Sequence, residues 1–275
     1  MTSIREQLAS EGLAPSKARG QNFLRHPATA GRIVDSLELE PGDAIVEIGP
    51  GLGQLTVALA ARARRLIALE VDRGLVELLG HSDLPANVEI RHQDVLTADL
   101  GGLVRELGTP VVLAGNLPYN ISGRILGMLL SPRNPFRRFG LMLQYEVGER
   151  VLAAPDTPDY GTLSVWARLY TRAWRALELG SGEFVPRPKV RSSFLVFEPV
   201  DTGIPVDDVR TLRRVVRAAF QQRRKTLRRV LRSLSPAADA ALAAAAIDGQ
   251  RRGETLSEAE FARLANALAT LDPNG

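Results

Sequence analysis

The segment Asn116-Leu-Pro-Tyr119 contains the groups best suited to chemistry. The amide oxygen of Asn116 and the backbone carbonyl of Leu117 can accept the two N–H bonds of an exocyclic amine such as that of adenine, which turns the nitrogen lone pair toward an electrophile. Pro118 fixes φ and stiffens the turn. The ring of Tyr119 can stack on an extruded base. The same segment is also compatible with an Asx-type turn that carries a buried tyrosine.

A glycine-rich turn precedes this segment, in Glu47-Ile-Gly-Pro-Gly-Leu-Gly53. Between a strand and a helix, Gly49 and Gly51 let the backbone approach a ligand that faces the helix N-terminus. The spacing does not fit the G-x-G-x-x-G pattern of a dinucleotide site, because residue 54 is a glutamine. A tight turn without any ligand is an equally good explanation of the glycines taken alone.

Two acidic residues stand at the ends of the next two predicted strands. From the end of its strand, Glu70 can accept hydrogen bonds from the ribose hydroxyls of a bound nucleoside. Asp94, in the same register, could accept from an adenine amino group. Each acid taken alone could equally be a solvated loop residue or a helix cap, Asp94 especially.

The composition excludes several other chemistries. There is no cysteine, so disulfides, cysteine-bearing metal sites and thiolate nucleophiles are absent. The three histidines, His26, His81 and His92, lack close metal-ligand spacing, so we expect no bound metal.

Alternating strands and helices must position these residues. Short apolar runs followed by helical patterns predict a parallel sheet covered on both faces, and hence the α/β class. The predicted strands are 43–48, 66–70, 88–92 and 111–114, with 141–144 and 193–197 as later strands of the same sheet.

The length of 275 residues suggests two domains. Residues 1–40 are predicted to form a helical lead-in, broken at 12–15 and near Gly20, in which Pro27 opens a helix. Only helical patterns follow Val206. We therefore predict a catalytic domain over 1–200, a linker at 203–205 and a small all-helical domain over 206–275.

Charge is distributed unevenly along the chain. The net charge is +4, yet residues 210–232 contain ten arginines and lysines and no acid. Such asymmetry indicates a polyanionic partner. No run reaches the roughly 18 apolar residues of a membrane span, and the N-terminus lacks the apolar segment of a signal peptide. We therefore expect a cytoplasmic protein.

In this order, the motifs resemble those of the ribosomal RNA adenine N6,N6-dimethyltransferases that modify small-subunit rRNA and confer kasugamycin sensitivity. The resemblance extends essentially end to end. Tyr145 stands where that family usually has a basic residue, and Arg19 and Arg229 also depart from its pattern. The matching segments are 20–24, 47–53, Glu70, Asp94, 116–122, 143–147, 184–190 and 220–227.

The resemblance implies a Rossmann-like methyltransferase fold that uses S-adenosylmethionine and no metal. It places Asn22, Leu24, Gly49 and Gly51 around this donor, with Glu70 at its ribose, Asp94 at its adenine and Asn116 between donor and target. It implies that Phe184 sandwiches the target adenine against Tyr119. The basic residues expected to contact RNA are Arg223, Arg224, Lys225 and Arg228.

The implied reaction is dimethylation of two adjacent adenosines in the hairpin loop near the 3′ end of 16S rRNA. The expected partner is the small ribosomal subunit or its precursor, and the protein is expected to act as a monomer. Three alternatives remain: a large-subunit 23S rRNA dimethyltransferase of the macrolide-resistance type, a non-catalytic assembly or transcription factor with this fold, and a DNA adenine methyltransferase.

Overall fold

The computed structural model describes residues 15, 20–108 and 110–272, and the chain divides into two compact units. One unit comprises Met1–Gly148 with Ala173–Pro199, and the other comprises Glu149–Arg172 with Val200–Gly275. The second unit thus resumes at residue 200, where the sequence predicts the domain boundary, but it also includes 149–172, which the sequence analysis assigned to the first domain. Within that segment, α8 (Thr162–Tyr170) packs against α9 (Val209–Gln221) and α12 (Glu258–Leu271).

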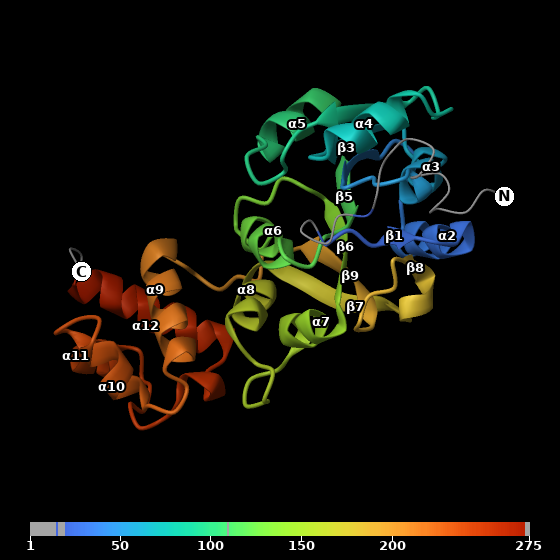
Figure 1. Ribbon diagram of the computed structural model, residues 1–275. Coiled ribbons are helices and arrows are strands. Elements are labelled where there is room, and N and C mark those ends of the chain that lie inside the picture. The colour runs from blue at the N-terminus through green and yellow to red at the C-terminus, as the bar shows by residue number, and fades with distance from the viewer. Residues whose placement is uncertain (1–14, 16–19, 109, 273–275) are drawn as a thin grey trace. The chain divides into compact units, whose positions relative to one another are not determined.

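A seven-stranded sheet forms the centre of the first unit (Figure 1). Its order is β4-β3-β2-β5-β6-β9-β7; the first five strands are parallel, and β9 runs antiparallel to β6. The strands are β2 (Ala44–Ile48), β3 (Arg65–Glu70), β4 (Val88–His92), β5 (Val111–Asn116), β6 (Arg138–Gln144), β7 (Thr171–Leu179) and β9 (Ser192–Pro199). The predicted α/β architecture and all six predicted strands are confirmed.

Helices cover both faces of this sheet. Apolar side chains of α2 and α3 pack on one face against alternate residues of β2, β3, β5, β6 and β9, and α5 and α6 lie on the other side (Figure 1). Residues of β2 and β5 are buried on both faces, as expected for central parallel strands. The helices of this unit are α2 (Pro27–Ser36), α3 (Gln54–Ala60), α4 (Arg73–Gly80), α5 (Leu100–Leu107) and α6 (Ser122–Leu129). Helix α7 (Tyr145–Leu152) begins in the first unit and ends in the second.

A two-stranded sheet ties the N-terminal segment to a later part of the first unit. Here β1 (Phe23–Leu24) pairs antiparallel with β8 (Phe184–Val185), which follows the short 3-10 helix Ser181–Glu183. The backbone N–H of Arg25 donates to the carbonyl of Glu183 at 2.8 Å. The helix predicted to open at Pro27 is present as α2. The predicted helix before residue 15 and the break at 12–15 lie outside the described residues, apart from Pro15.

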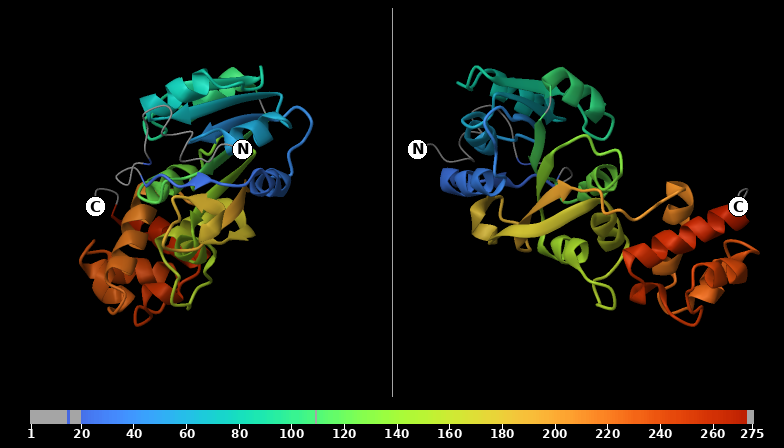
Figure 2. Two further views of the ribbon diagram at one scale, coloured as in Figure 1. Left: turned by 45° about the vertical axis from the view of Figure 1, so that its right-hand side comes forward. Right: turned by 180° about the vertical axis from the view of Figure 1, so that it is seen from behind.

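The second unit is helical in its C-terminal part. In addition to α9 and α12 it contains α10 (Leu227–Arg232), α11 (Ala238–Ala244) and a 3-10 helix at Gly253–Thr255. Every third or fourth residue of α9 is apolar and buried, which leaves its arginines on the other face. The Tyr160 hydroxyl donates to the Leu256 carbonyl at 2.8 Å, and its ring meets Phe220 edge-on. Figure 2 shows the fold of this unit from two further directions.

The arginine-rich stretch is not one continuous helix, because α9 ends at residue 221 and α10 begins at 227. Helices in the described part of the chain are either too short or too polar to cross a membrane.

Candidate active site

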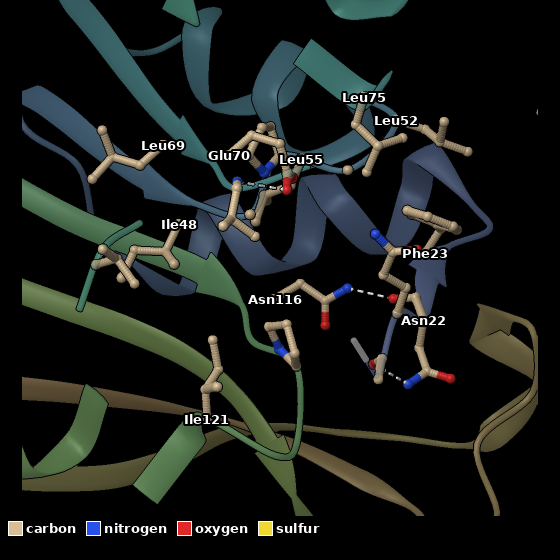
Figure 3. Close-up of a pocket in the computed structure, with 18 of the residues that line it drawn as sticks. Asn22, Phe23, Ile48, Leu52, Leu55, Leu69, Glu70, Leu75, Asn116 and Ile121 are labelled. Carbon is tan, nitrogen blue, oxygen red and sulfur yellow. Dashed lines mark hydrogen bonds between the residues drawn. The ribbon is translucent and has the colours of Figure 1, made fainter. Parts of the chain in front are cut away.

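A cavity opens at the carboxyl ends of β2, β3, β4 and β5 (Figure 3). Its space, including the open mouth, is about 1030 Å³. In doubly wound sheets this edge is the usual place for ligands. The predicted residues that line it are Asn22, Leu24, Gly49, Gly51, Glu70, Asp94, Asn116 and Pro118.

The glycine turn forms one wall of the cavity. Gly49, Gly51 and Gly53 have φ of 67°, 59° and 81°, a region that side chains strongly disfavour. A Cβ on Gly51 would lie 2.8 Å from the Phe23 ring, which itself lines the cavity. Glycine is therefore required at residue 51 both by the backbone angle and by the close approach of that ring.

Glu70 ends β3 with its side chain at the cavity and is only 6% exposed, so it is not a solvated loop residue. Its Oε1 accepts hydrogen bonds from the backbone N–H groups of Val71 and Asp72, each at 2.9 Å. Burial raises the pKa of Glu70, and these backbone donors oppose the rise. The hydrogen bonds fix the orientation of the carboxylate at the cavity.

Asp94 lies just beyond β4, where it accepts a hydrogen bond within a turn and also lines the cavity. Its Oδ1 accepts from the backbone N–H of Leu96 at 2.9 Å, so it stabilises the turn that follows the strand. The residue also lines the cavity between its neighbours Gln93 and Val95. A turn-stabilising aspartate therefore faces the same space as Glu70.

The amide of Asn116 is held in one orientation at the end of β5. Its Nδ2 donates to the backbone carbonyl of Asn22 at 2.7 Å, while Asn22 Nδ2 donates to the Gly20 carbonyl at 3.0 Å. Figure 3 shows the Asn116 amide nitrogen directed at Asn22 and its oxygen turned away from that bond. Because the nitrogen is occupied, the amide presents an acceptor to an incoming amine.

The remaining predicted residues of the target site, Leu117, Tyr119 and Phe184, do not line the cavity. Leu117 is buried, and the Tyr119 hydroxyl is 2.8 Å from Ser192 Oγ in β9. Burial raises the pKa of Tyr119, so this hydroxyl stays protonated. Phe184 is 1% exposed and packs in the core, next to Leu24 in the β1–β8 ladder. Stacking of an adenine on Phe184 therefore requires its side chain to leave the core, and this role stays a prediction.

Sequence reasoning did not single out Glu47, which lies in the interior strand β2. The residue is 1% exposed, and neither carboxyl oxygen has a hydrogen-bond partner in the described part of the chain. Burial raises the pKa of Glu47 to about 8, so the side chain is protonated at neutral pH. Its place beside the glycine turn could have drawn attention to it, but its missing partners are visible only in the structure.

Three other lining residues without a role predicted from the sequence form an apolar wall of the cavity. Phe23, Leu52 and Leu75 belong to a small cluster that α4 completes with Leu78 and Leu79. Their sequence signal was weak, because isolated apolar residues near strand ends usually belong to the general core. Further missed lining residues are Gln21, Gln54, Val71, Gln93, Val95, Asn120 and Ile121.

The predicted RNA-binding residues lie in the second unit and differ in their pairing. Arg223 forms an ion pair with Glu254 at 3.0 Å, and Arg228 forms one with Asp239 at 3.0 Å. Arg224 and Lys225 are exposed and pair with no acid among the described residues. Two of the four predicted cations are therefore already partly neutralised within the protein.

The described residues contain no cluster of three or more histidine, aspartate or glutamate side chains suited to hold a metal ion. A reaction without a metal stays a prediction.

Comparison with known proteins identifies relatives over nearly the whole chain. The Ribosomal RNA adenine dimethylase family matches residues 15–270. The Ribosomal RNA small subunit methyltransferase A of Geobacter metallireducens is 43% identical over 96% of this chain and 99% of its own length. The protein of that name from Magnetococcus marinus is 40% identical over 96% and 95% of the two chains.

Solved structures share the fold. A dimethyladenosine transferase from Plasmodium falciparum aligns with a TM-score of 0.75 over 90% of this chain and 98% of its own, at 22% identity. The 23S rRNA methyltransferase ErmE aligns with a TM-score of 0.64 over 90% and 99%, at 26% identity. From the match over residues 15–270 and the relatives at 40% identity or more, the chain belongs to the ribosomal RNA adenine dimethylase family.

Proposed function

We propose that the protein uses S-adenosylmethionine to dimethylate the N6 amines of two adjacent adenosines in the hairpin loop near the 3′ end of 16S rRNA. Its substrate is the small ribosomal subunit or a precursor of it. The observation that carries the proposal is the fixed Asn116 amide, which presents an acceptor at the edge of the cavity that Glu70 and Asp94 also line.

The side chains that line the cavity fit the donor. Glu70 would hold the ribose hydroxyls, and Asp94 would accept from the adenine amino group through the carboxylate oxygen that Leu96 leaves free. Because Gly49 and Gly51 have no side chains, the backbone of the turn would lie close to the donor. Asn22 and Leu24, from the N-terminal segment, line the cavity as well. When bound, this donor supplies a methyl group on a positively charged sulfur.

The protein's part in the transfer is to position the amine. Asn116 Oδ1 and the Leu117 carbonyl would accept its two N–H bonds, so that the nitrogen lone pair faces the methyl group in line with the bond that breaks. Tyr119, held by Ser192, supplies a ring for the extruded base. A general base is not needed, because the alkylated amine is acidic enough to lose its proton to water.

The relatives support a small-subunit substrate over the large-subunit alternative. Relatives at 43% and 40% identity carry the small-subunit name over almost their full length, whereas the 23S rRNA methyltransferase ErmE is 26% identical. The substrate would place the protein in the cytoplasm, where we propose that it acts as a monomer. Intact Glu70 and Asn116 disfavour a non-catalytic factor.

We assign the main RNA contacts of the second unit to Arg224 and Lys225. They are exposed and lack acidic partners among the described residues, whereas Arg223 and Arg228 already pair with Glu254 and Asp239. A phosphate contact contributes more binding free energy at an unpaired cation, because no existing ion pair has to be broken first.

The proposal is tested by methyl incorporation from labelled donor into small subunits, naked 16S rRNA, 23S rRNA and duplex DNA. We expect two methyl groups on each of two adjacent adenosines of the small-subunit RNA and none on 23S rRNA or DNA. Asn116→Ala should abolish transfer, while calorimetry still detects donor binding. Labelling of 23S rRNA alone, or full activity of Asn116→Ala, would overturn the assignment.

A further inference from the structure

A tyrosine at the carboxyl end of β6 carries two guanidinium groups on its ring. The Cζ atoms of Arg175 and Arg191 lie 4.5 and 4.2 Å from the ring centroid of Tyr145. The Tyr145 backbone N–H also donates to the Arg191 carbonyl at 3.0 Å. Cations stacked in this way lose side-chain freedom but keep their charge, so Arg191 is held in place directly before β9.

The Glu178 carboxylate forms ion pairs with both of these arginines. Glu178 is 3.1 Å from Arg175 and 3.3 Å from Arg191, so one carboxylate serves two guanidinium groups. The side chain of Arg191 is nevertheless 62% exposed. Its pairing is therefore weak enough to be exchanged for another anion.

Two more cations precede Arg191 at every second position. Arg187 and Lys189 are exposed in the proline-containing segment between β8 and β9, and neither forms an ion pair with any residue that the structure describes. We name Arg187, Lys189 and Arg191 the basic strip. Its cations are separated by one proline and one valine, and no acid lies between them. By its composition, and because Arg187 and Lys189 have no ion pair among the described residues, the strip is suited to bind a polyanion.

The position of the strip along the chain relates it to the target base. It begins three residues after Phe184 and ends one residue before Ser192, whose Oγ lies 2.8 Å from the hydroxyl of Tyr119. The strip therefore connects the two aromatic residues assigned above to the target adenine. When a base enters between those residues, the phosphates of the same nucleotide must lie close to this segment, because a single ribose joins the base to the RNA backbone.

We propose that the basic strip binds the backbone phosphates of the nucleotides beside the target adenosine, and that Tyr145 holds Arg191 for this contact. The inference rests on the proposed function, and it adds an RNA-binding surface in the first unit to the cations of the second. The expected partner is single-stranded or loop RNA. The strip contains cations but no asparagine or glutamine that could read a base, and the target base must already be unstacked when it reaches the site.

The test compares Arg187→Gln/Lys189→Gln with a charge-matched control, Arg32→Gln/Arg133→Gln. The control residues are exposed. Arg133 precedes the amino end of β6, whereas the strip precedes β9, which runs antiparallel to β6 and so begins at the opposite end of that strand. Binding of a hairpin RNA with two adjacent loop adenosines is measured over a range of salt concentrations. Loss of two phosphate contacts should reduce the slope of log K against log salt by about 1.4. The control should keep the slope of the unmodified protein.

Kinetics on small subunits supply a second readout. We expect Arg187→Gln/Lys189→Gln to raise KM for the subunit at least fivefold, with kcat and donor affinity within twofold of the unmodified protein. Tyr145→Leu should raise KM as well, whereas Tyr145→Phe, which keeps the ring, should not. An unchanged salt slope in the strip variant, or equal effects of Leu and Phe at Tyr145, would overturn the inference.

The two proposals fail in different ways. If the unmodified protein binds the hairpin RNA but methylates neither it nor small subunits, the proposed function is wrong, and the salt slopes still report on the strip. If it methylates small subunits while the strip variant binds and reacts like the control, the inference alone is wrong.

Discussion

Among single residues, the pair Tyr119 and Ser192 gives a sharp test of how the target base is held. We expect Ser192→Ala to lower kcat about threefold to tenfold, because loss of one hydrogen bond of about 1 kcal/mol frees the Tyr119 ring. The matched control is Ser193→Ala, which removes a buried hydroxyl with no hydrogen-bond partner in the described residues. Donor affinity by calorimetry should be unchanged in both variants.

Tyr119→Phe removes the same hydrogen bond from the other side. If that bond is the reason for the effect, Ser192→Ala/Tyr119→Phe should be no slower than either single variant. Multiplicative losses in the double variant, or an equal loss in Ser193→Ala, would mean that Ser192 acts through general packing.

Glu47 leads to a prediction about pH and stability. Its pKa is raised to about 8 in the folded protein, against an ordinary value of 4.5. Between these values the folded chain keeps a proton that the unfolded chain releases, so the free energy of unfolding falls as pH rises, by up to about 1.4 kcal/mol per pH unit. Glu47→Gln should remove this contribution.

Urea unfolding of both proteins between pH 5 and pH 9 measures the difference. The stability of Glu47→Gln relative to the unmodified protein should increase with pH and level off above about pH 8. A pH-independent difference would show that Glu47 ionises normally in the folded state.

The site residues that could be predicted from the sequence are those at the ends of strands. Glu70, Asp94 and Asn116 each end or follow a parallel strand, so sequence order alone brings them to one edge of the sheet. The state of Glu47 and the stacking on Tyr145 depend on side chains from distant segments, which no local pattern specifies.

At the scale of elements, the glycine turn between β2 and α3 combines backbone strain with close packing. Gly51→Ala places a side chain at φ 59° and 2.8 Å from Phe23, so it should destabilise the fold by about 1–3 kcal/mol and weaken donor binding at least tenfold. The donor affinity is measured by calorimetry and the stability by urea unfolding.

The control is a glycine within a helix. Gly127 in α6 is exposed and has nothing within 4 Å of an added Cβ. Gly127→Ala should therefore stabilise the protein by about 0.5–1 kcal/mol and leave donor affinity unchanged. If the two substitutions had the same effect, the special role of the turn would be refuted.

Elements were predictable where they are buried on both faces. The central strands are continuous apolar runs, and the sequence located them to within a few residues. Strand β7 was missed because it lies at the edge of the sheet, and its middle residues are only partly buried. Residues 149–172 were placed in the other domain because their packing against α9 and α12 is long-range, and only three-dimensional contacts reveal it.

For the whole molecule, the prediction concerns how charge is divided along the chain. The ten cations of residues 210–232 are set against a net charge of about −6 elsewhere, but acids from outside this run already neutralise some of them. Asp239 pairs with both Arg228 and Arg232, and Glu254 pairs with Arg223. The charge available to RNA is therefore smaller than the sequence total, and it is concentrated at the cations without partners.

Two double variants test whether RNA binding depends on the unpaired cations of this run or on its total charge. Each variant removes two cations. Arg224→Gln/Lys225→Gln removes unpaired cations, so the salt slope of RNA binding should fall by about 1.4. Arg228→Gln/Arg232→Gln removes cations that share Asp239, so its slope should fall by less than half as much. Equal reductions would mean that RNA displaces Asp239 and that total charge governs binding. A larger reduction in the first variant would mean that the ion pairs within the second unit select which arginines contact RNA.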